Sequence, residues 1–172
     1  MIYEGVGTDT KEKPERSRGK RRCQGKMKLA NKYQLEICKA MLDRKNRVRG
    51  CMLNDNDYAV TFDGYRCFVF GKSQVVFDIG KIEPLDFQKL FERRKDLPLR
   101  ITRDFYFTQD GHHAVKLEAE NGEFHVWLRS EYLKGMDMYR LLGCSPTERV
   151  LVLDMLDNLI GAILPIDMHG KR

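Results

Sequence analysis

The stretch LRITRDFYF-TQDG-HHAVKLEAE-NG-EFHVWLR, residues 99–129, constrains the fold more than any other part of this chain. It contains three segments in which apolar and polar residues alternate, separated by two turn signals. Alternation with a period of two is typical of strands that bury one face against a core. The sequence therefore predicts a three-stranded antiparallel meander with one buried face and one solvent-exposed face.

Asn121-Gly122 sets the register of the second hairpin. This dipeptide is favoured in two-residue turns, because both central residues of such a turn need a positive φ. Closing the hairpin there pairs Leu117 with Val126 and Glu118 with His125. One face then collects only apolar side chains: Val115, Leu117, Ala119, Phe124, Val126 and Leu128.

The first hairpin of the meander has a less obvious turn. A three-residue loop that ends with Gly111 in the left-handed conformation keeps Ile101, Phe105 and Phe107 on the apolar face. A two-residue turn would place both phenylalanines among the charged side chains, so we expect the longer loop. The same register puts Arg103 on the apolar face, which the pattern does not explain.

The remaining segments predict helices and strands on either side of the meander. Apolar residues at spacings of three and four indicate amphipathic helices, and apolar runs bounded by turn residues indicate strands. A turn at Asp63-Gly64 pairs Val60 with Cys67, and the final hairpin is either central in a sheet or an exposed edge. The predicted segments are helix 29–45, strand 47–53, hairpin 58–70, strand 74–79, helix 84–95, a helix from Ser130 to about Gly143, and hairpin 149–168.

Charge is unevenly distributed between a tail and a body. Residues 1–28 hold nine Lys/Arg against four Asp/Glu and few apolar residues, which predicts a disordered basic tail. Residues 29–172 hold 22 against 21, so the single α+β domain predicted there is almost neutral. Arg18, Lys20, Arg21 and Arg22 suit a phosphate-binding arm. The alternatives are a solvated tail, or a natural start at Met27.

The sequence also indicates where in the cell the protein is expected. No apolar run reaches the roughly 18 residues that span a bilayer, and the N-terminus has no apolar signal-peptide core. We expect a cytoplasmic protein with no membrane partner. Its five scattered cysteines contain no C-x-x-C and predict reduced thiols.

Few residues point to enzyme chemistry. His112 and His113 are adjacent in a strand and face opposite sides, so they are a poor metal pair. Glu118, Glu120 and Glu123 share one face and leave a magnesium-dependent nuclease as an alternative. The sequence predicts no catalytic residue, cofactor or metal ligand set, and it favours a binding role over an enzyme.

The C-terminal third resembles a known family. The segments WLRSEYL (127–133), VLVL (150–153) and AILPIDM (162–168) are similar to the closing segment of bacterial DNA sliding clamps, the beta subunit of DNA polymerase III. In that family a strand leads to a "Y-L" helix, a β-hairpin and a terminal apolar strand with a proline near its end. The order of the earlier elements also resembles the clamp's repeated helix-and-strands module.

The resemblance implies a clamp-like α+β fold of antiparallel meanders packed with two to three amphipathic helices. It implies a non-enzymatic DNA-associated accessory protein, of the kind that phages and mobile elements encode. A polymerase-type peptide in a surface groove and a homo-oligomer are the partners implied besides DNA. The DNA-facing candidates on its helices are Lys32, Lys39, Lys89, Arg93 and Arg94. The first alternative function is a protein-interaction module that self-associates through Leu159–Leu164.

Overall fold

The computed structural model describes residues 32–43, 45–108, 110–134 and 140–166, and it has the predicted α+β character. A helix over 32–42 comes first. The other elements, in chain order, are β1 (Arg49–Met52), β2 (Asp57–Thr61), β3 (Arg66–Gly71), η1 (Lys72–Gln74), η2 (Ile79–Lys81), β4 (Glu83–Pro84), α2 (Gln88–Phe91), β5 (Leu97–Phe107), β6 (His113–Ala119), β7 (His125–Arg129), α3 (Ser130–Leu133), β8 (Arg140–Gly143), β9 (Val150–Leu153) and β10 (Leu159–Ile163).

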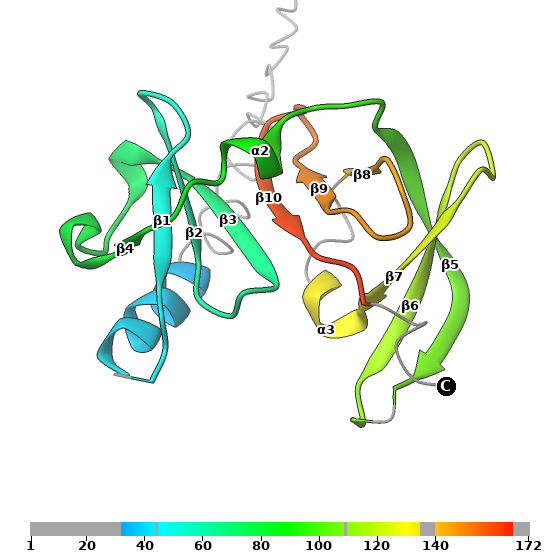
Figure 1. The fold of residues 1–172 in the computed structure, drawn as a ribbon, viewed down its shortest axis with the longest axis horizontal. Coiled ribbons are helices and arrows are strands. Elements are labelled where there is room, and N and C mark those ends of the chain that lie inside the picture. The colour runs from blue at the N-terminus through cyan, green and yellow to red at the C-terminus, as the bar shows by residue number, and fades with distance from the viewer. Residues whose placement is uncertain (1–31, 44, 109, 135–139, 167–172) are drawn as a thin grey trace, which may run out of the picture.

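The described strands form one mixed sheet in the order β4-β1-β2-β3-β10-β9-β8-β5-β6-β7. The short β4 is parallel to β1, and every other neighbouring pair is antiparallel. β3 pairs with β10, with Cys67 opposite Ala162, and this pairing joins the early strands to the late ones. Figure 1 shows the two groups of strands on either side of this junction.

The sheet contains an internal repeat. Helix 32–42 is followed by the meander β1-β2-β3, and α3 is followed by the meander β8-β9-β10. In the sheet these six strands run in the order β1-β2-β3-β10-β9-β8, so the two meanders meet at their last strands. Each unit therefore consists of a helix and three antiparallel strands, and the antiparallel β3–β10 pair gives the two units an approximate two-fold relation.

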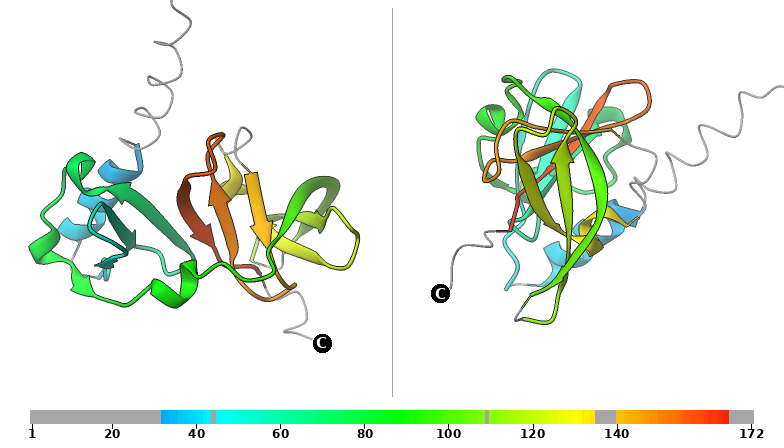
Figure 2. Two further views of the ribbon diagram at one scale, coloured as in Figure 1. Left: turned by 90° about the horizontal axis from the view of Figure 1, so that it is seen from above. Right: turned by 90° about the vertical axis from the view of Figure 1, so that its right-hand side faces the viewer.

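The central strands are buried on both faces. In β2, Val60 packs under helix 32–42 while Ala59 packs in the cluster that holds the α2 segment. In β9, Val152 packs with α3 while Leu151 packs with α2. Helix 32–42 and α3 thus cover one side of the sheet, which we call the helix-pair face (Figure 2). The α2 segment covers the other side, which we call the α2 face. Each fully buried aliphatic side chain contributes about 1.5–3 kcal/mol, which accounts for the continuous apolar runs.

The predicted meander is confirmed, with a change in one turn and a register shift in β5 between Ile101 and Phe105. Gly111 has φ 81°, and the Thr108 amide donates to the carbonyl of His112, as a three-residue loop requires. The β6–β7 register pairs Leu117 with Val126, as predicted. The turn between β6 and β7 is longer than the predicted two residues. The Gly122 amide donates to the Ala119 carbonyl, and Gly122 has φ 76°, while Asn121 has no positive φ. The alternating pattern, rather than the turn type, fixed this register.

The β2–β3 hairpin is shifted by one residue from the register predicted for residues 58–70. Val60 lies opposite Phe68, not Cys67. The turn is longer because the Asp63 carboxylate accepts hydrogen bonds from the amides of Tyr65 and Arg66. The observed register places the large residues of both strands together on the helix-pair face.

Two predicted segments adopt other conformations because distant side chains bind their backbone. Residues 74–79 form no strand: Gln34 donates to the Gln74 carbonyl and accepts from the Val76 amide. Helix 84–95 shrinks to α2, since Pro84 belongs to β4 and the Leu90 carbonyl accepts from the Arg149 guanidinium.

The other predicted helices are also shorter. Helix 32–42 buries Tyr33 and Ile37 as predicted, but Leu42 at its end is 86% exposed. The third helix ends at Leu133, and Arg140–Gly143 is the strand β8 instead of helix. No helix in the described part of the chain is long and apolar enough to cross a bilayer.

The final hairpin is central in the sheet. β10 has β3 on one side and β9 on the other, so it is not an exposed edge. Pro165 follows the end of the strand, as a residue without an amide hydrogen requires. The first alternative function, self-association through Leu159–Leu164, loses the strand edge on which it depends.

Candidate functional site

The helix-pair face carries two of the predicted DNA-contacting residues. Lys32 and Lys39 are exposed on the outward side of helix 32–42, opposite the buried Ile37. No salt bridge between described residues involves either lysine. Both ammonium groups are thus available to an anion at this face.

A hollow of about 380 Å³ lies between helix 32–42 and α3. At its wall the Arg66 guanidinium lies 4.8 Å from the centre of the Tyr132 ring, and the Asp63 carboxylate binds Arg66 at 2.7 Å. Burial raises the pKa of the Tyr132 phenol, so the ring stays neutral. Lys32 and Lys134, one from each repeat unit, line this hollow together with Glu36 and Glu131.

The α2 face carries the other three predicted residues. Lys89, Arg93 and Arg94 are exposed there, and only Arg94 has a salt bridge among the described residues, at 2.9 Å to Glu148. The sheet separates these residues from Lys32 and the rest of the helix-pair face. One straight duplex lying against the protein therefore cannot contact both sets.

Arg149 holds the segment that follows α2 against the sheet. Its side chain is 5% exposed and binds Asp96 at 2.6 Å, with Asp96 itself 3% exposed. It also donates to the carbonyls of Leu90 and Glu92, at 2.9 Å and 2.6 Å. This buried cation therefore fixes the backbone that carries the basic residues of the α2 face.

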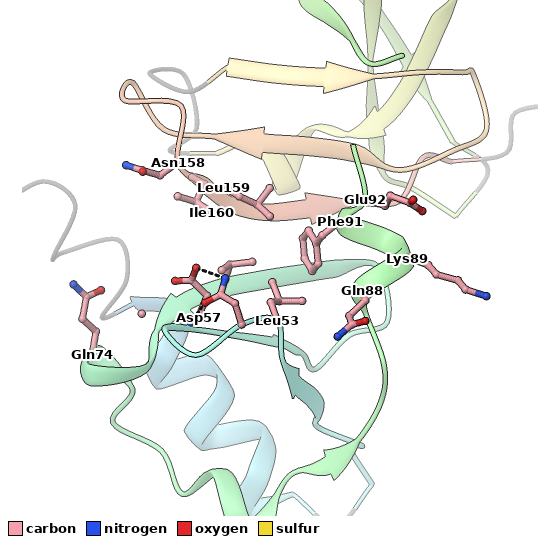
Figure 3. A pocket seen from close by; sticks show the side chains of 13 residues that line it. Leu53, Asp57, Gln74, Gln88, Lys89, Phe91, Glu92, Asn158, Leu159 and Ile160 are labelled. Carbon is pink, nitrogen blue, oxygen red and sulfur yellow. Dashed lines mark hydrogen bonds between the residues drawn. The ribbon is translucent and has the colours of Figure 1, made fainter. Parts of the chain in front are cut away.

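A cleft of about 1020 Å³ opens where β3 and β10 separate (Figure 3). The β3–β10 ladder ends at Phe68, and residues beyond it line the cleft together with the β9–β10 turn. Leu53 and Phe91 give the cleft an apolar floor, while Lys89 points away from it (Figure 3). Its mixed lining favours no particular ligand.

A smaller groove of about 550 Å³ lies beside α2, towards β1. Apolar residues such as Phe87 and Leu164 line it, together with the cations of Lys45, Arg47, Arg49 and Arg66. Glu83 neutralises Arg49 at 3.2 Å and Asp63 neutralises Arg66 at 2.7 Å, whereas no salt bridge between described residues involves the side chain of Lys45 or Arg47. An apolar lining with a basic rim suits an extended chain that carries both acidic and apolar groups. We call it the α2 groove.

The metal-site alternative finds no support in the described part of the chain. No group of three His, Cys, Asp or Glu residues there has the geometry to hold a metal ion. Glu118 instead binds Arg100 at 2.7 Å, and this hydrogen bond holds the pKa of the Glu118 carboxyl below its usual range. Glu118 also lies opposite His125, as predicted, while His112 faces Glu131 at 3.6 Å. Glu118 therefore forms an ordinary ion pair at the surface.

The aromatic side chains differ in exposure, and the described thiols are free. Tyr58 is 3% exposed and belongs to the core, whereas Tyr106 is 47% exposed. Four of the five predicted reduced thiols are free; the fifth, Cys23, lies outside the described residues.

Sequence reasoning missed Arg149 and the basic rim of the α2 groove. Arg47 and Arg49 alternate with Val48 at the start of a predicted strand, and this spacing signals a basic strand face. Arg149 had no such signal, since the carboxylate and the carbonyls that it binds lie more than 50 residues away.

The tail residues Arg18, Lys20, Arg21 and Arg22 lie outside the described residues. The first described residue after them is Lys32, at the start of helix 32–42. Comparison of this chain with protein-family models, with curated proteins and with solved structures finds no match.

Proposed function

We propose that this chain is a non-enzymatic, DNA-associated accessory protein with a sliding-clamp-like domain. The observation that supports the proposal most directly is the internal repeat. A helix and three antiparallel strands occur twice, the two meanders join through β3 and β10 in one sheet, and both helices cover the same face. Because both helices lie on one face, the two units form one continuous surface. The hollow lined by residues 32–36 and 131–134 lies between the two helices.

DNA contact is assigned to the helix-pair face. Lys32 and Lys39 carry no ion pair within the described residues, and Lys134 extends the set across the seam between the units. The basic tail, whose residues 1–28 have five more Lys/Arg than Asp/Glu, precedes helix 32–42 of this face in the sequence. Each phosphate contact, from the tail or from a helix surface, adds a salt-dependent contribution to the affinity.

The test is fluorescence anisotropy with a labelled duplex at several salt concentrations. The helix-face variant Lys32→Gln/Lys39→Gln and the α2-face variant Lys89→Gln/Arg93→Gln remove the same charge from opposite faces. We expect the first to weaken binding and to reduce the slope of log K against log salt by about 2, since each phosphate contact contributes about 0.9. The second should leave both quantities nearly unchanged.

Three results would count against this assignment. Loss of affinity only in the α2-face variant would move the contact to the opposite face. Loss only when Arg18, Lys20, Arg21 and Arg22 are replaced by glutamine would reduce the contact to the tail. No binding of the full chain at low salt would refute the association with DNA altogether.

A polymerase-type peptide is proposed as a second partner, bound in the α2 groove. The groove combines apolar residues such as Phe87 with the cations of Lys45 and Arg47. A labelled peptide with two leucines and two acidic residues should bind, and Arg47→Glu should weaken it at least tenfold, whereas Lys39→Glu on the other face should not. Equal binding by both variants would refute this use of the groove.

A further inference from the structure

The outer edge of β5 is unusual among the described strands. Leu99 is the last residue of β5 that pairs with β8. Beyond it, no described strand pairs with β5 on the side away from β6. The exposed edge carries Phe105 and Phe107, whose side chains are 66% and 60% exposed. Natural sheets usually protect such edges with charges or prolines, because an unpaired apolar edge invites another strand.

The hydrogen bonding of β5 shows which backbone groups face outward. The Thr108 amide donates to the His112 carbonyl, which makes Thr108 and Tyr106 the residues that bond to β6. The N–H and C=O groups of Phe105 and Phe107 alternate with these and point to the outer edge. Both phenylalanine side chains also share one face of the sheet, with Phe107 against His113 at 4.3 Å between ring centres.

We propose that two copies of this chain form a dimer by antiparallel pairing of their β5 strands about a two-fold axis at Tyr106. In this register Phe105 of each copy lies opposite Phe107 of the other as a hydrogen-bonded pair. The same two residues that point their backbone groups outward therefore satisfy one another. The cross-strand aromatic pairs add to the stability of the pairing. This inference does not depend on the proposed binding of DNA.

Charge supports a second copy as the occupant of this edge. Arg103 lies in an irregular part of β5, between the paired residues Ile101 and Phe105, and no described carboxylate binds it. Pairing about Tyr106 brings Arg103 to the 108–111 turn of the other copy. The Asp110 side chain in that turn binds Arg129 of its own chain at 3.3 Å, but it is 63% exposed and keeps a side open to a second cation. The dimer thus gives Arg103 a partner that it lacks within one chain.

The area of the edge sets the expected strength. A fully exposed aromatic side chain presents about 200 Å², so the observed exposures of Phe105, Tyr106 and Phe107 leave roughly 350 Å² per copy. Stable interfaces bury about 800 Å² per partner, so even with the backbone edge included this is a small interface. We therefore expect a reversible dimer with a dissociation constant on the order of micromolar.

The first experiment is analytical ultracentrifugation of the full chain over a concentration series without DNA. Phe105→Lys/Phe107→Lys should shift the dissociation constant at least tenfold towards monomer. Leu35→Lys/Leu42→Lys is the matched control, because it replaces two apolar residues that are 60% and 86% exposed on helix 32–42. The control should dimerise like the unchanged chain, and circular dichroism checks that each variant is folded.

A second experiment tests the register. Tyr106→Cys places two thiols across the axis and should give a disulfide-linked dimer on mild oxidation, whereas Thr108→Cys should not. Arg103→Glu should weaken the dimer, and Arg103→Glu/Asp110→Arg should restore it. A chain that stays monomeric to about 100 µM, a dimer insensitive to the double lysine variant, or equal cross-linking at both positions would overturn the proposal. Binding of a different extended peptide to a monomeric chain would assign the edge to another occupant.

Discussion

Replacing Arg149 by methionine tests the claim that one buried cation shapes the α2 face. The substitution keeps an unbranched side chain but leaves the Asp96 carboxylate, 3% exposed, without its cation. Breaking a buried ion pair in this way costs about 3–5 kcal/mol. The carbonyls of Leu90 and Glu92 lose a donor as well, so the upper part of this range applies.

The assay is urea unfolding followed by circular dichroism, with thermal melting in parallel. At about 2–4 °C per kcal/mol for a chain of this size, a loss of about 4 kcal/mol lowers the midpoint by roughly 8–16 °C. Arg94→Met is the matched control, because its pair with Glu148 is about half exposed and should cost less than about 1 kcal/mol. Asp96→Asn combined with Arg149→Met should cost clearly less than the two single changes together. A loss below about 1 kcal/mol for Arg149→Met, or strict additivity, would refute the argument.

Three further predictions concern the junction, a surface carboxylate and a buried thiol. A Cβ at Gly161 would lie 2.6 Å from the Cys67 carbonyl oxygen, so Gly161→Ala should cost about 1–3 kcal/mol in urea unfolding, while Gly80→Ala should cost little. The lowered pKa of Glu118 means that its pair with Arg100 stabilises the fold above about pH 4.3. That stability is lost as the pH falls through the folded pKa, so the melting difference between the chain and Glu118→Gln should shrink from pH 7 to 3; a constant difference would contradict this. Burial raises the pKa of the Cys67 thiol, which should react with a thiol reagent more slowly than the half-buried cysteines, and equal rates would contradict its burial.

Features with a short-range cause were predictable from the sequence. The 99–129 meander follows from alternation, and the register of β6 and β7 was right although the turn type was not. The final hairpin was recognised, since Val150–Leu153 is apolar on both faces and all four residues are buried. Its central position depended on pairing with β3, which no local pattern reveals.

Features with a long-range cause were not predictable. Gln34 binds the backbone at Gln74 and Val76, 40 residues away or more, and this contact replaces the strand expected there. Arg149 likewise binds the Leu90 carbonyl and ends α2 early. Neither side chain differs in sequence from an ordinary surface residue, so only the assembled sheet shows what it binds.

The candidate site shows the same division between local and long-range causes. Helical spacing correctly placed Lys32, Lys39 and Lys89 on the surface. It gave no sign that the sheet separates the first two from the third, because the side on which a helix packs depends on the strand order. The near-neutral body therefore does not argue against an anion site. Opposite charges cancel in the sum over the chain, whereas a ligand contacts only the charges of one face.

The β3–β10 junction connects this argument to the fold. Lys32 belongs to the first repeat unit and Lys134 to the second, and they line one hollow only because the two meanders are joined through β3 and β10. The Arg66 guanidinium crosses this seam to the Tyr132 ring at 4.8 Å, so the two helices are held in a fixed relation. A surface built from two units can keep this geometry only while the junction is closed. The proposed binding of DNA at the helix-pair face and the stability of the junction should therefore be thermodynamically linked. If the proposal holds, DNA raises the unfolding midpoint of the chain and of Gly161→Ala alike.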